Sequence, residues 1–224
     1  MEKIAVKKMI ARSFQTAEAM KTFRTNLQFS AENVSVVALT SVNASEGKST
    51  IAFQLAASLA ENGKRVLLMD ADLRKNTLAS RLGISGNAAG LSHCLTGLVG
   101  INDAMLETDL TGLYVLLAGA KVPNSAELLG GKNFQRLVQG LRSVFDYVIV
   151  DVAPLGQVID CAVIASQMDG VVMVVDTTAN SYKPERRMKA QLEKAGGKIL
   201  GVVLNRVDNG SRKGYYGAAY GYET

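Results

Sequence analysis

The stretch Val34-Ser-Val-Val-Ala-Leu-Thr-Ser-Val-Asn-Ala-Ser-Glu-Gly-Lys-Ser-Thr50 decides the fold of this chain. Its first seven residues form a short apolar, β-branched run, which is typical of a strand covered on both faces. Polar residues follow from Ser41 to Gly47, and residues 49–62 are rich in Ala, Leu and Gln and end before Gly63, a common residue at helix ends. The stretch therefore predicts a buried strand, a loop and a helix in direct succession.

The loop has the composition of a phosphate-binding P-loop, because Gly47, Lys48 and Ser49 lie between the strand and the helix. Backbone N–H groups at the helix start attract anions, Lys48 adds a full positive charge, and the Ser49 hydroxyl is placed to ligate magnesium. Val42 stands where the usual spacing has its first glycine, and the plain alternative is a turn with a surface lysine. The residues expected to bind nucleotide here are Ala44, Ser45, Glu46, Gly47, Lys48, Ser49 and Thr50.

The rest of the chain alternates between apolar runs and segments of helical periodicity. Strands are expected at 65–70, 113–117, 146–151, 170–176 and 199–205, and helices at 14–30, 133–144 and 184–195. This order predicts an α/β fold of the P-loop NTPase type, with a doubly wound, mostly parallel sheet flanked by helices. We expect one domain over residues 1–207 and a flexible tail over 208–224, which lacks apolar periodicity.

Three aspartates follow predicted strands: Asp70 and Asp72 come after the second strand, and Asp151 ends the fourth. Because the carboxyl ends of parallel strands meet at one crevice, these side chains should lie beside the phosphate loop. Their charges would repel one another unless a cation lay among them, and magnesium, which uses few protein carboxylates together with phosphate oxygens, fits this role. The alternative for each, and for Asp72 above all, is a helix N-cap.

The formal charge of +5 is concentrated near the C-terminus, where residues 180–224 hold nine Lys or Arg against four Asp or Glu. Such a region could contact nucleic acid, anionic lipid or an acidic partner, or it could be a solvated helix face. No recognition motif accompanies the charge, so we expect no nucleic-acid partner. No apolar run is long enough to span a membrane, which predicts a cytoplasmic protein brought to the membrane by something else. The cysteines, Cys94 and Cys161, are expected to be reduced.

Several motifs in the same order resemble the cytoplasmic kinase domain of bacterial tyrosine kinases (BY-kinases), autokinases that act with exopolysaccharide and capsule export systems. The resemblance covers nearly the whole chain. The motifs that carry it are Glu18-Ala-Met-Lys-Thr-Phe-Arg-Thr-Asn-Leu27, the phosphate loop, Leu67-Leu-Met-Asp-Ala-Asp-Leu-Arg74, Pro123-Asn-Ser-Ala-Glu-Leu-Leu129, Asp146-Tyr-Val-Ile-Val-Asp151, Gly201-Val-Val-Leu-Asn205 and the tyrosine-rich C-terminus.

The resemblance implies ATP-dependent phosphorylation of tyrosine. Lys48 would hold the β- and γ-phosphates, while Ser49, Asp72 and Asp151 would hold Mg²⁺ directly or through water. Asp70 would take the proton from the tyrosine hydroxyl, whose ordinary pKa near 10 makes a base useful. The catalytic set would thus be Lys48, Asp70, Asp72 and Asp151. Asn205 resembles the asparagine that reads adenine in related ATPases and is expected to bind nucleotide; the alternative is a turn residue at the end of a strand.

The expected phosphate acceptors are in the tail, because four of the seven tyrosines fall in the last ten residues: Tyr215, Tyr216, Tyr220 and Tyr222. The alternative is an aromatic tail that packs on a partner. Each phosphate would add a charge of about −1.5 to −2, so two or more could cancel the positive charge of the region.

The resemblance also implies partners. A Glu-x-x-Arg-x-x-Arg pattern on the first helix, 14–30, builds a ring of subunits in the family, and each subunit presents its tail to the next. Glu18 and Arg24 match this pattern, but Lys21 replaces the first arginine and lacks its bidentate fork. The alternative for these charges is a solvated helix face. We further expect a separate membrane activator and a phosphotyrosine phosphatase.

Other departures from the family concern the loop and its surroundings. Ala44 and Ser45 replace a usual Pro-Gly, and 152–154 reads Val-Ala-Pro instead of Thr-Pro-Pro. A serine at 45 must adopt a conformation that glycine tolerates more easily, which predicts weaker nucleotide binding with the site still active. Two alternatives stay open. One is an ATPase switch of the partitioning or division-site type, although the extra lysine of that group is Asn43 here; the other is a nucleotide-binding regulator without kinase activity.

Overall fold

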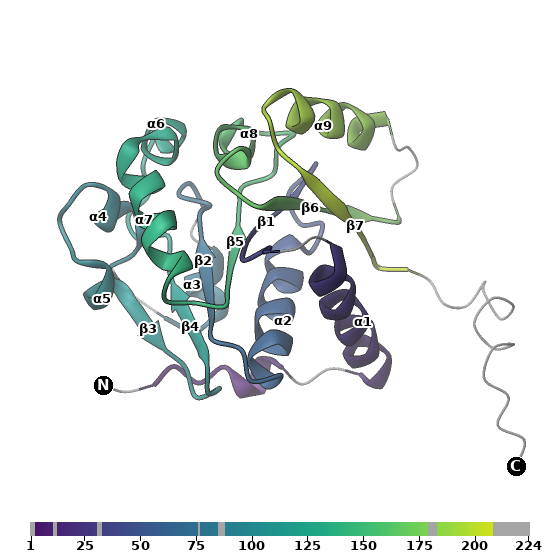
Figure 1. Ribbon diagram of the computed structural model, residues 1–224, viewed down its shortest axis with the longest axis horizontal. Helices are drawn as coiled ribbons and strands as arrows, with labels where there is room; N and C mark the ends of the chain where they lie inside the picture. Colours follow the sequence, from purple (N-terminus) through teal and green to yellow (C-terminus); the bar gives the residue numbers. More distant parts are fainter. Residues whose placement is uncertain are drawn as a thin grey trace, which may run out of the picture.

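The computed structural model describes residues 3–10, 13–30, 33–75, 77–84, 88–178 and 183–207. These residues form a seven-stranded sheet of order β3-β4-β2-β5-β1-β6-β7 (Figure 1). Every adjacent pair is parallel except β3 and β4, which are antiparallel. The strands are β1 (Val36–Ser41), β2 (Val66–Asp70), β3 (Met105–Glu107), β4 (Leu113–Leu116), β5 (Tyr147–Asp151), β6 (Gly170–Asp176) and β7 (Ile199–Asn205).

Helices cover both faces of the sheet, and an apolar cluster fills the space under each layer. One cluster packs α1, α2 and α3 against the sheet, and the other packs the helices from α4 to α9. The central strands β1, β2 and β5 are almost wholly buried, because both faces are covered. The helices are α1 (Phe14–Ser30), α2 (Lys48–Glu61), α3 (Thr77–Arg81), α4 (Leu91–Leu95), α5 (Ile101–Ala104), α6 (Ser125–Gly130), α7 (Lys132–Arg142), α8 (Asp160–Ala165) and α9 (Lys183–Lys194), and a 3₁₀ turn covers Lys7–Met9.

The predicted doubly wound, mostly parallel sheet is confirmed, and each of the six expected strands is present. The sequence did not predict β3, which has three residues, or the short helices α3, α4, α5, α6 and α8. Segments of three to six residues are too short to show a hydrophobic period. Residues 208–224 lie outside the described part of the chain, so the expected tail and its boundary stay predictions. Among the described residues, no helix combines the length and apolar character that a membrane span requires.

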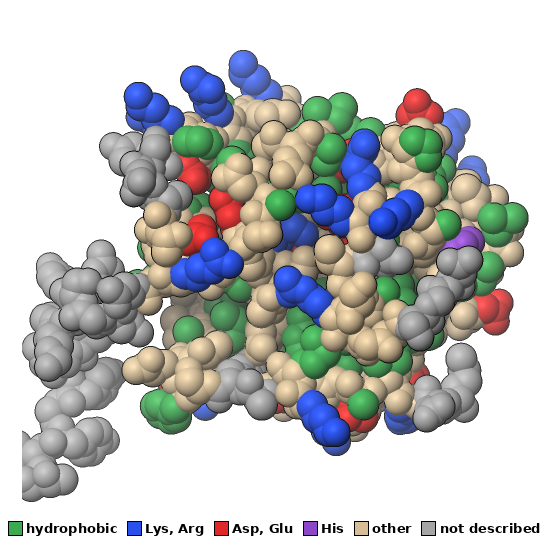
Figure 2. All heavy atoms as spheres, turned by 180° about the vertical axis from the view of Figure 1, so that it is seen from behind, with side chains coloured by type: hydrophobic (Ala, Val, Ile, Leu, Met, Phe, Trp, Pro, Cys, Tyr) green, Lys and Arg blue, Asp and Glu red, His purple; other side chains and the backbone are tan. Residues whose placement is uncertain are grey.

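The basic region predicted near the C-terminus includes α9, whose Lys and Arg residues are exposed. Figure 2 shows Lys and Arg side chains along the upper edge of the molecule, where α9 lies. Met188 and Leu192 turn inward to the core, and Lys189 forms an exposed ion pair with Glu193 at 2.9 Å. This arrangement supports a solvated amphipathic helix face.

The sheet order places the ends of three strands in one crevice. β1 lies between β5 and β6, and the chain enters α2 directly after β1 through residues 42–47. β2 lies on the other side of β5, and Asp70 is in register with Asp151. Since ligands bind at the carboxyl ends of strands where the winding direction changes, this edge of the sheet is where the site belongs.

Candidate active site

The phosphate loop ends in a helix start that is shaped to receive an anion. Gly47 is the N-cap of α2 and has φ of 91°, a left-handed conformation that glycine adopts without strain. A side chain there would also collide with Asn205, since a Cβ atom would lie 2.1 Å from the Asn205 amide nitrogen. Lys48 and Ser49, the first residues of α2, line one hollow together with the loop, and the N–H groups of a first helical turn have no partner within the helix. The residues that line this hollow are Ser41, Asn43, Ala44, Ser45, Gly47, Lys48, Ser49, Asp72, Lys75, Thr77, Arg81 and Pro154.

Lys48 is buried and forms a close ion pair with Asp151 at the end of β5. Its ammonium nitrogen also lies 3.4 Å from the Ser49 hydroxyl. A buried ammonium needs such partners, because an unpaired charge in this setting would be strongly unfavourable. The lysine and the carboxylate that the sequence assigned to phosphate and magnesium are therefore direct neighbours.

The three predicted aspartates meet at this edge of the sheet. The Asp72 N–H donates to Asp70 Oδ1 at 3.0 Å, and the Ala71 N–H donates to the Asp151 carbonyl at 2.8 Å. Asp70 is fully buried, and Asp72 and Asp151 nearly so. Within the part of the chain that the structure describes, no group donates a hydrogen bond to the second oxygen of Asp70 or of Asp151. Two buried carboxylate oxygens without donors at one edge are suited to a cation or to a substrate proton.

Burial and, after it, the negative charge of Asp151 raise the pKa of Asp70 to about 8, against the opposing effects of the Asp72 N–H and of Lys48. A carboxyl group with a pKa this close to neutrality accepts a proton much more strongly than an ordinary aspartate. The site thus contains one carboxyl group, Asp70, tuned as a base, and another, Asp151, that is paired with a cation. Such a separation of roles is typical of active sites.

The residues fit a magnesium ion that is held partly by phosphate. Ser49 and Asp72 line the hollow, and Asp151 has an oxygen without a donor. Asp72 Oδ1 accepts the N–H groups of Arg74 and Lys75 at 3.4 and 3.2 Å, so the alternative role of Asp72 in capping a turn is real but occupies only that oxygen. Within the described residues, no group of three His, Cys, Asp or Glu side chains forms a complete metal site by itself. Mg²⁺ commonly takes one or two carboxylates and completes its shell with water and phosphate oxygens.

Two cations at the rim of the hollow were not predicted from the sequence. Arg81, at the end of α3, donates to the Thr50 hydroxyl, and Lys75 donates to the Gln157 side chain at 3.3 Å. Both have neutral partners in these contacts, which leaves their charge available to an anion in the hollow. Neither position belongs to a motif, and only the packing of α3 and its preceding loop against the phosphate loop brings them there.

A second group that the sequence did not predict supports the loop carrying Asp72. Asp160, at the start of α8, is fully buried and accepts the Ser125 hydroxyl at 2.6 Å and the Arg74 guanidinium at 3.5 Å. The contact joins the motif around residues 70–74 to the motif around residues 123–129. It gives both motifs a structural role next to the site.

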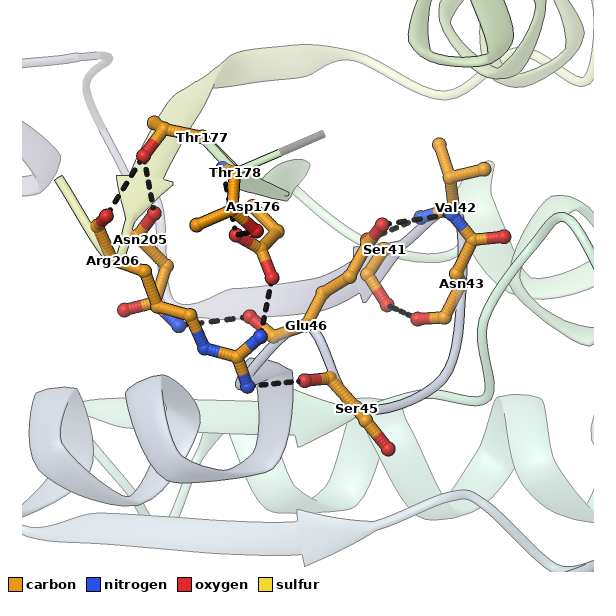
Figure 3. A network of polar contacts seen from close by, with 10 residues as sticks. All are labelled: Ser41, Val42, Asn43, Ser45, Glu46, Asp176, Thr177, Thr178, Asn205 and Arg206. Carbon is orange, nitrogen blue, oxygen red and sulfur yellow. Dashed lines mark hydrogen bonds and ion pairs between the residues drawn. The ribbon is translucent and has the colours of Figure 1, made fainter. Parts of the chain in front are cut away.

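The other side of the phosphate loop is held by its own Glu46 and by the end of β7 (Figure 3). Glu46 is buried and accepts the Val42 N–H at 3.1 Å and the Asn43 side-chain amide at 2.9 Å. Asn205 donates from its side-chain amide to the Glu46 carbonyl at 2.8 Å. Asn43, at the position of the extra lysine in the switch ATPases, is therefore used within its own loop.

The residues predicted for a subunit ring lie on α1. Glu18 and Lys21 form an exposed ion pair at 2.7 Å, whereas Arg24 donates to the Ser58 carbonyl on α2 at 2.9 Å. Glu18 and Lys21 thus form the i,i+3 pair of a solvated helix face, and Arg24 holds α1 against α2. The predicted acceptors Tyr215, Tyr216, Tyr220 and Tyr222 lie outside the described residues.

Known proteins are similar to this chain over most of its length. A family model described as an AAA domain matches residues 34–205. The tyrosine-protein kinase CpsD of Streptococcus agalactiae is 37% identical over 194 residues, which cover 87% of this chain and 85% of that protein. The kinase domain of the Escherichia coli tyrosine kinase ETK superposes with a TM-score of 0.82 at 31% identity, covering 92% of this chain and 80% of that one.

The septum site-determining protein MinD of Pyrococcus horikoshii, solved as a complex with Mg-ADP, is a more distant neighbour. Its TM-score is 0.67 at 24% identity, covering 80% of this chain and 73% of that one, so it shows the shared fold alone. The matches in sequence and structure instead confirm the family that the motifs predicted. The chain belongs to the AAA-domain proteins and, among them, to the bacterial tyrosine kinases.

Proposed function

We propose that this protein is an ATP-dependent protein-tyrosine kinase whose acceptors are tyrosines in the C-terminal tail of a neighbouring copy. The proposal rests on one observation: a buried carboxyl group with a raised pKa, Asp70, lies in register with Asp151, which forms an ion pair with Lys48 of the phosphate loop. Simple ATP hydrolysis does not need so basic a carboxylate, but removal of a proton from a tyrosine hydroxyl benefits from one.

The groups divide the work of phosphoryl transfer, in which positioning and charge neutralisation dominate. Lys48 would turn from Asp151 toward the β- and γ-phosphates, and the first-turn N–H groups of α2 would hold the phosphate oxygens. Ser49, Asp72 and Asp151 would hold Mg²⁺, which supplies charge neutralisation on the transferred phosphate when bound. Asp70 would accept the proton of the attacking hydroxyl at its unpaired Oδ2.

Acceptors from a second copy fit the composition of the chain. Tyr215, Tyr216, Tyr220 and Tyr222 lie in a segment rich in Gly and Ala, a composition that favours access of a neighbouring copy to the tyrosines. The outward Glu18–Lys21 pair on α1 offers a polar contact for a neighbour in a ring. Phosphate on the tail would add negative charge to a basic region, which provides a means to loosen such an assembly.

A role in capsule or exopolysaccharide synthesis is inferred from the resemblance of the motifs to the BY-kinases, and a relative named tyrosine-protein kinase CpsD is 37% identical to this chain. We place the protein in the cytoplasm, recruited to the inner face of the cell membrane by a separate membrane activator that binds near the nucleotide site. A phosphotyrosine phosphatase would reverse the modification.

One experiment tests the proposal. The purified chain is incubated with ATP and Mg²⁺, alone and with a membrane fraction that supplies the activator, and phosphate is located by mass spectrometry. We expect phosphotyrosine within residues 215–222 that is lost in Lys48→Ala and retained in Lys194→Ala, an exposed lysine in the last turn of α9 that does not line the hollow. ATP hydrolysis without phosphotyrosine under both conditions would favour the ATPase switch, and nucleotide binding without either reaction would favour the regulator.

A further inference from the structure

We propose that Arg206 is a positioning residue for the phosphate loop, which it holds in the left-handed conformation that this chain must adopt without a glycine at position 45. The inference rests on the proposed nucleotide site. It concerns a residue outside every motif that the sequence singled out, one position beyond the end of β7.

The loop is strained at the position where it lacks a glycine. Ser45 has φ of 67°, in the left-handed region that residues with a side chain seldom adopt. Such a conformation persists only where the surroundings hold it. At Ser45 the holding contact is direct: Arg206 Nη2 donates to the Ser45 carbonyl oxygen at 2.7 Å.

The arginine is itself fixed by several contacts (Figure 3). Its Nη1 pairs with Asp176 at the end of β6, and Asp176 accepts the N–H and the hydroxyl of Thr178 at 3.0 and 2.7 Å. These Thr178 hydrogen bonds, together with the charge of Arg206, hold the pKa of Asp176 below its usual range, so the ion pair is charged at neutral pH. The Thr177 hydroxyl lies 2.9 Å from the Arg206 carbonyl, which it contacts as a donor. The backbone of Arg206 is also left-handed, with φ of 58°.

Two hydrogen bonds from the end of β7 reach adjacent peptide units of the phosphate loop. Asn205 binds the Glu46 carbonyl and Arg206 binds the Ser45 carbonyl, so consecutive residues of one strand end clamp consecutive residues of the loop. The C=O and the N–H of one peptide unit point in opposite directions. Because the two carbonyls are held by β7, the N–H groups of the residues that follow them are directed to the opposite side, where phosphate would bind. Loss of the arginine would release Ser45 to relax toward an ordinary conformation and misplace those donors.

Substitution of Arg206 alone and together with Ser45 distinguishes two roles of Arg206: holding the phosphate loop in position, and contacting the nucleotide directly. The dissociation constant of Mg-ADP is measured by calorimetry, and KM for ATP and kcat are measured with a tyrosine-containing acceptor peptide. For Arg206→Ala we expect about tenfold weaker nucleotide binding and a KM raised by a similar factor, the scale of one lost charge-assisted hydrogen bond, with kcat changed less than about threefold. In Arg206→Ala/Ser45→Gly we expect most of the affinity to return, because glycine adopts the required φ unaided.

Controls separate this effect from general damage. Arg136→Ala removes an exposed arginine on α7 outside the hollow and should leave binding and melting temperature as in the unaltered protein. Asp176→Asn, which keeps Arg206 but weakens its anchor, should shift the affinity in the same direction by a smaller factor and serves as the test if Arg206→Ala does not fold. Affinity within twofold of the unaltered protein in both Arg206→Ala and Asp176→Asn would overturn the inference. So would a double variant as weak as Arg206→Ala, since glycine cannot replace a direct contact to the nucleotide. If the unaltered chain does not bind Mg-ADP, the proposed nucleotide site fails instead.

Discussion

The two walls of the phosphate hollow are built in different ways. On one side, Asp70 and Asp151 lie at the ends of buried strands and Lys48 lies at the start of α2, and each has the residue type that its chemistry requires. On the other side, the loop from Val42 to Glu46 departs from the usual glycine pattern and is held by contacts from the ends of β6 and β7. We call the first side the carboxylate wall and the second side the loop wall. The carboxylate wall depends on the identity of its side chains, whereas the loop wall depends on a backbone conformation that residues at the ends of β6 and β7 maintain.

This difference predicts different consequences of substitution. A change in the carboxylate wall removes a functional group that nothing else provides, so it should reduce the rate of the chemical step. A change in the loop wall alters the orientation of backbone donors and should appear mainly in nucleotide affinity.

The largest effect is expected for Asp70→Asn in the carboxylate wall. Loss of the base should lower kcat about 10²- to 10⁴-fold, while the dissociation constant of Mg-ADP should change only a few-fold, because the amide keeps the size and the acceptor oxygen of the carboxylate. The measurement is steady-state phosphorylation of a tyrosine peptide beside calorimetric binding. Asp103→Asn, in α5 and outside the site, is the matched control. An unchanged kcat in Asp70→Asn would remove Asp70 from its proposed role as the base.

The same substitution should stabilise the nucleotide-free chain. The pKa of Asp70 is raised to about 8 in the folded protein, so between about pH 4 and pH 8 the folded state binds a proton that the unfolded state has released. The free energy of unfolding therefore falls as pH rises across this window, and Asn at this position removes that loss. We expect Asp70→Asn to raise the free energy of unfolding by on the order of a few kcal/mol at pH 8 and by little at pH 4.

Urea denaturation across this pH range, without nucleotide or Mg²⁺, tests the pH dependence. The difference between the two proteins should grow from pH 4 to pH 8 and level off above it. A difference independent of pH would mean that Asp70 is not protonated on folding. If the variant is more stable and less active, the carboxylate of Asp70 lowers the stability of the folded protein while it serves the reaction in the carboxylate wall.

In the loop wall, Gly47→Ala should weaken Mg-ADP binding about ten- to a hundredfold. The φ of 91° would strain alanine, and its Cβ would have to displace the Asn205 amide. Adding Asn205→Ala should relieve the collision but not the strain, and it also removes the hydrogen bond from Asn205 to the Glu46 carbonyl, so recovery should be partial. Gly140→Ala is the matched control, because a Cβ there meets nothing within 4 Å and α7 should become slightly more stable. Binding as tight in Gly47→Ala as in the unaltered chain would contradict the strained geometry of the helix start.

The sequence was informative about one wall and much less so about the other, for a physical reason. Asp70 and Asp151 could be predicted to meet because parallel strands of regular length bring their ends to one edge. Arg206 and Asp176 could not be predicted to hold the loop, because their contact depends on how far β6 and β7 extend and on a left-handed turn after Asn205. Arg81 reaches Thr50 only through a five-residue helix with no periodic signal. The sequence did show that a serine at position 45 would need an unusual conformation, and the φ of 67° confirms this.

The smallest effect is expected for Ser45→Gly in the otherwise unaltered chain. Glycine removes the strain at φ of 67°, but it also adds freedom to the loop before binding, and Arg206 already holds the carbonyl of this residue. The two contributions nearly cancel, so Mg-ADP binding should tighten only about two- to threefold, with kcat unchanged. Calorimetry with the single variant, set against the same substitution in the Arg206→Ala background, gives the coupling between the two residues. If glycine tightened binding tenfold or more with Arg206 present, the contacts from β6 and β7 would not compensate for the missing glycine. The loop of this chain would then bind nucleotide less tightly than a loop with glycine at this position.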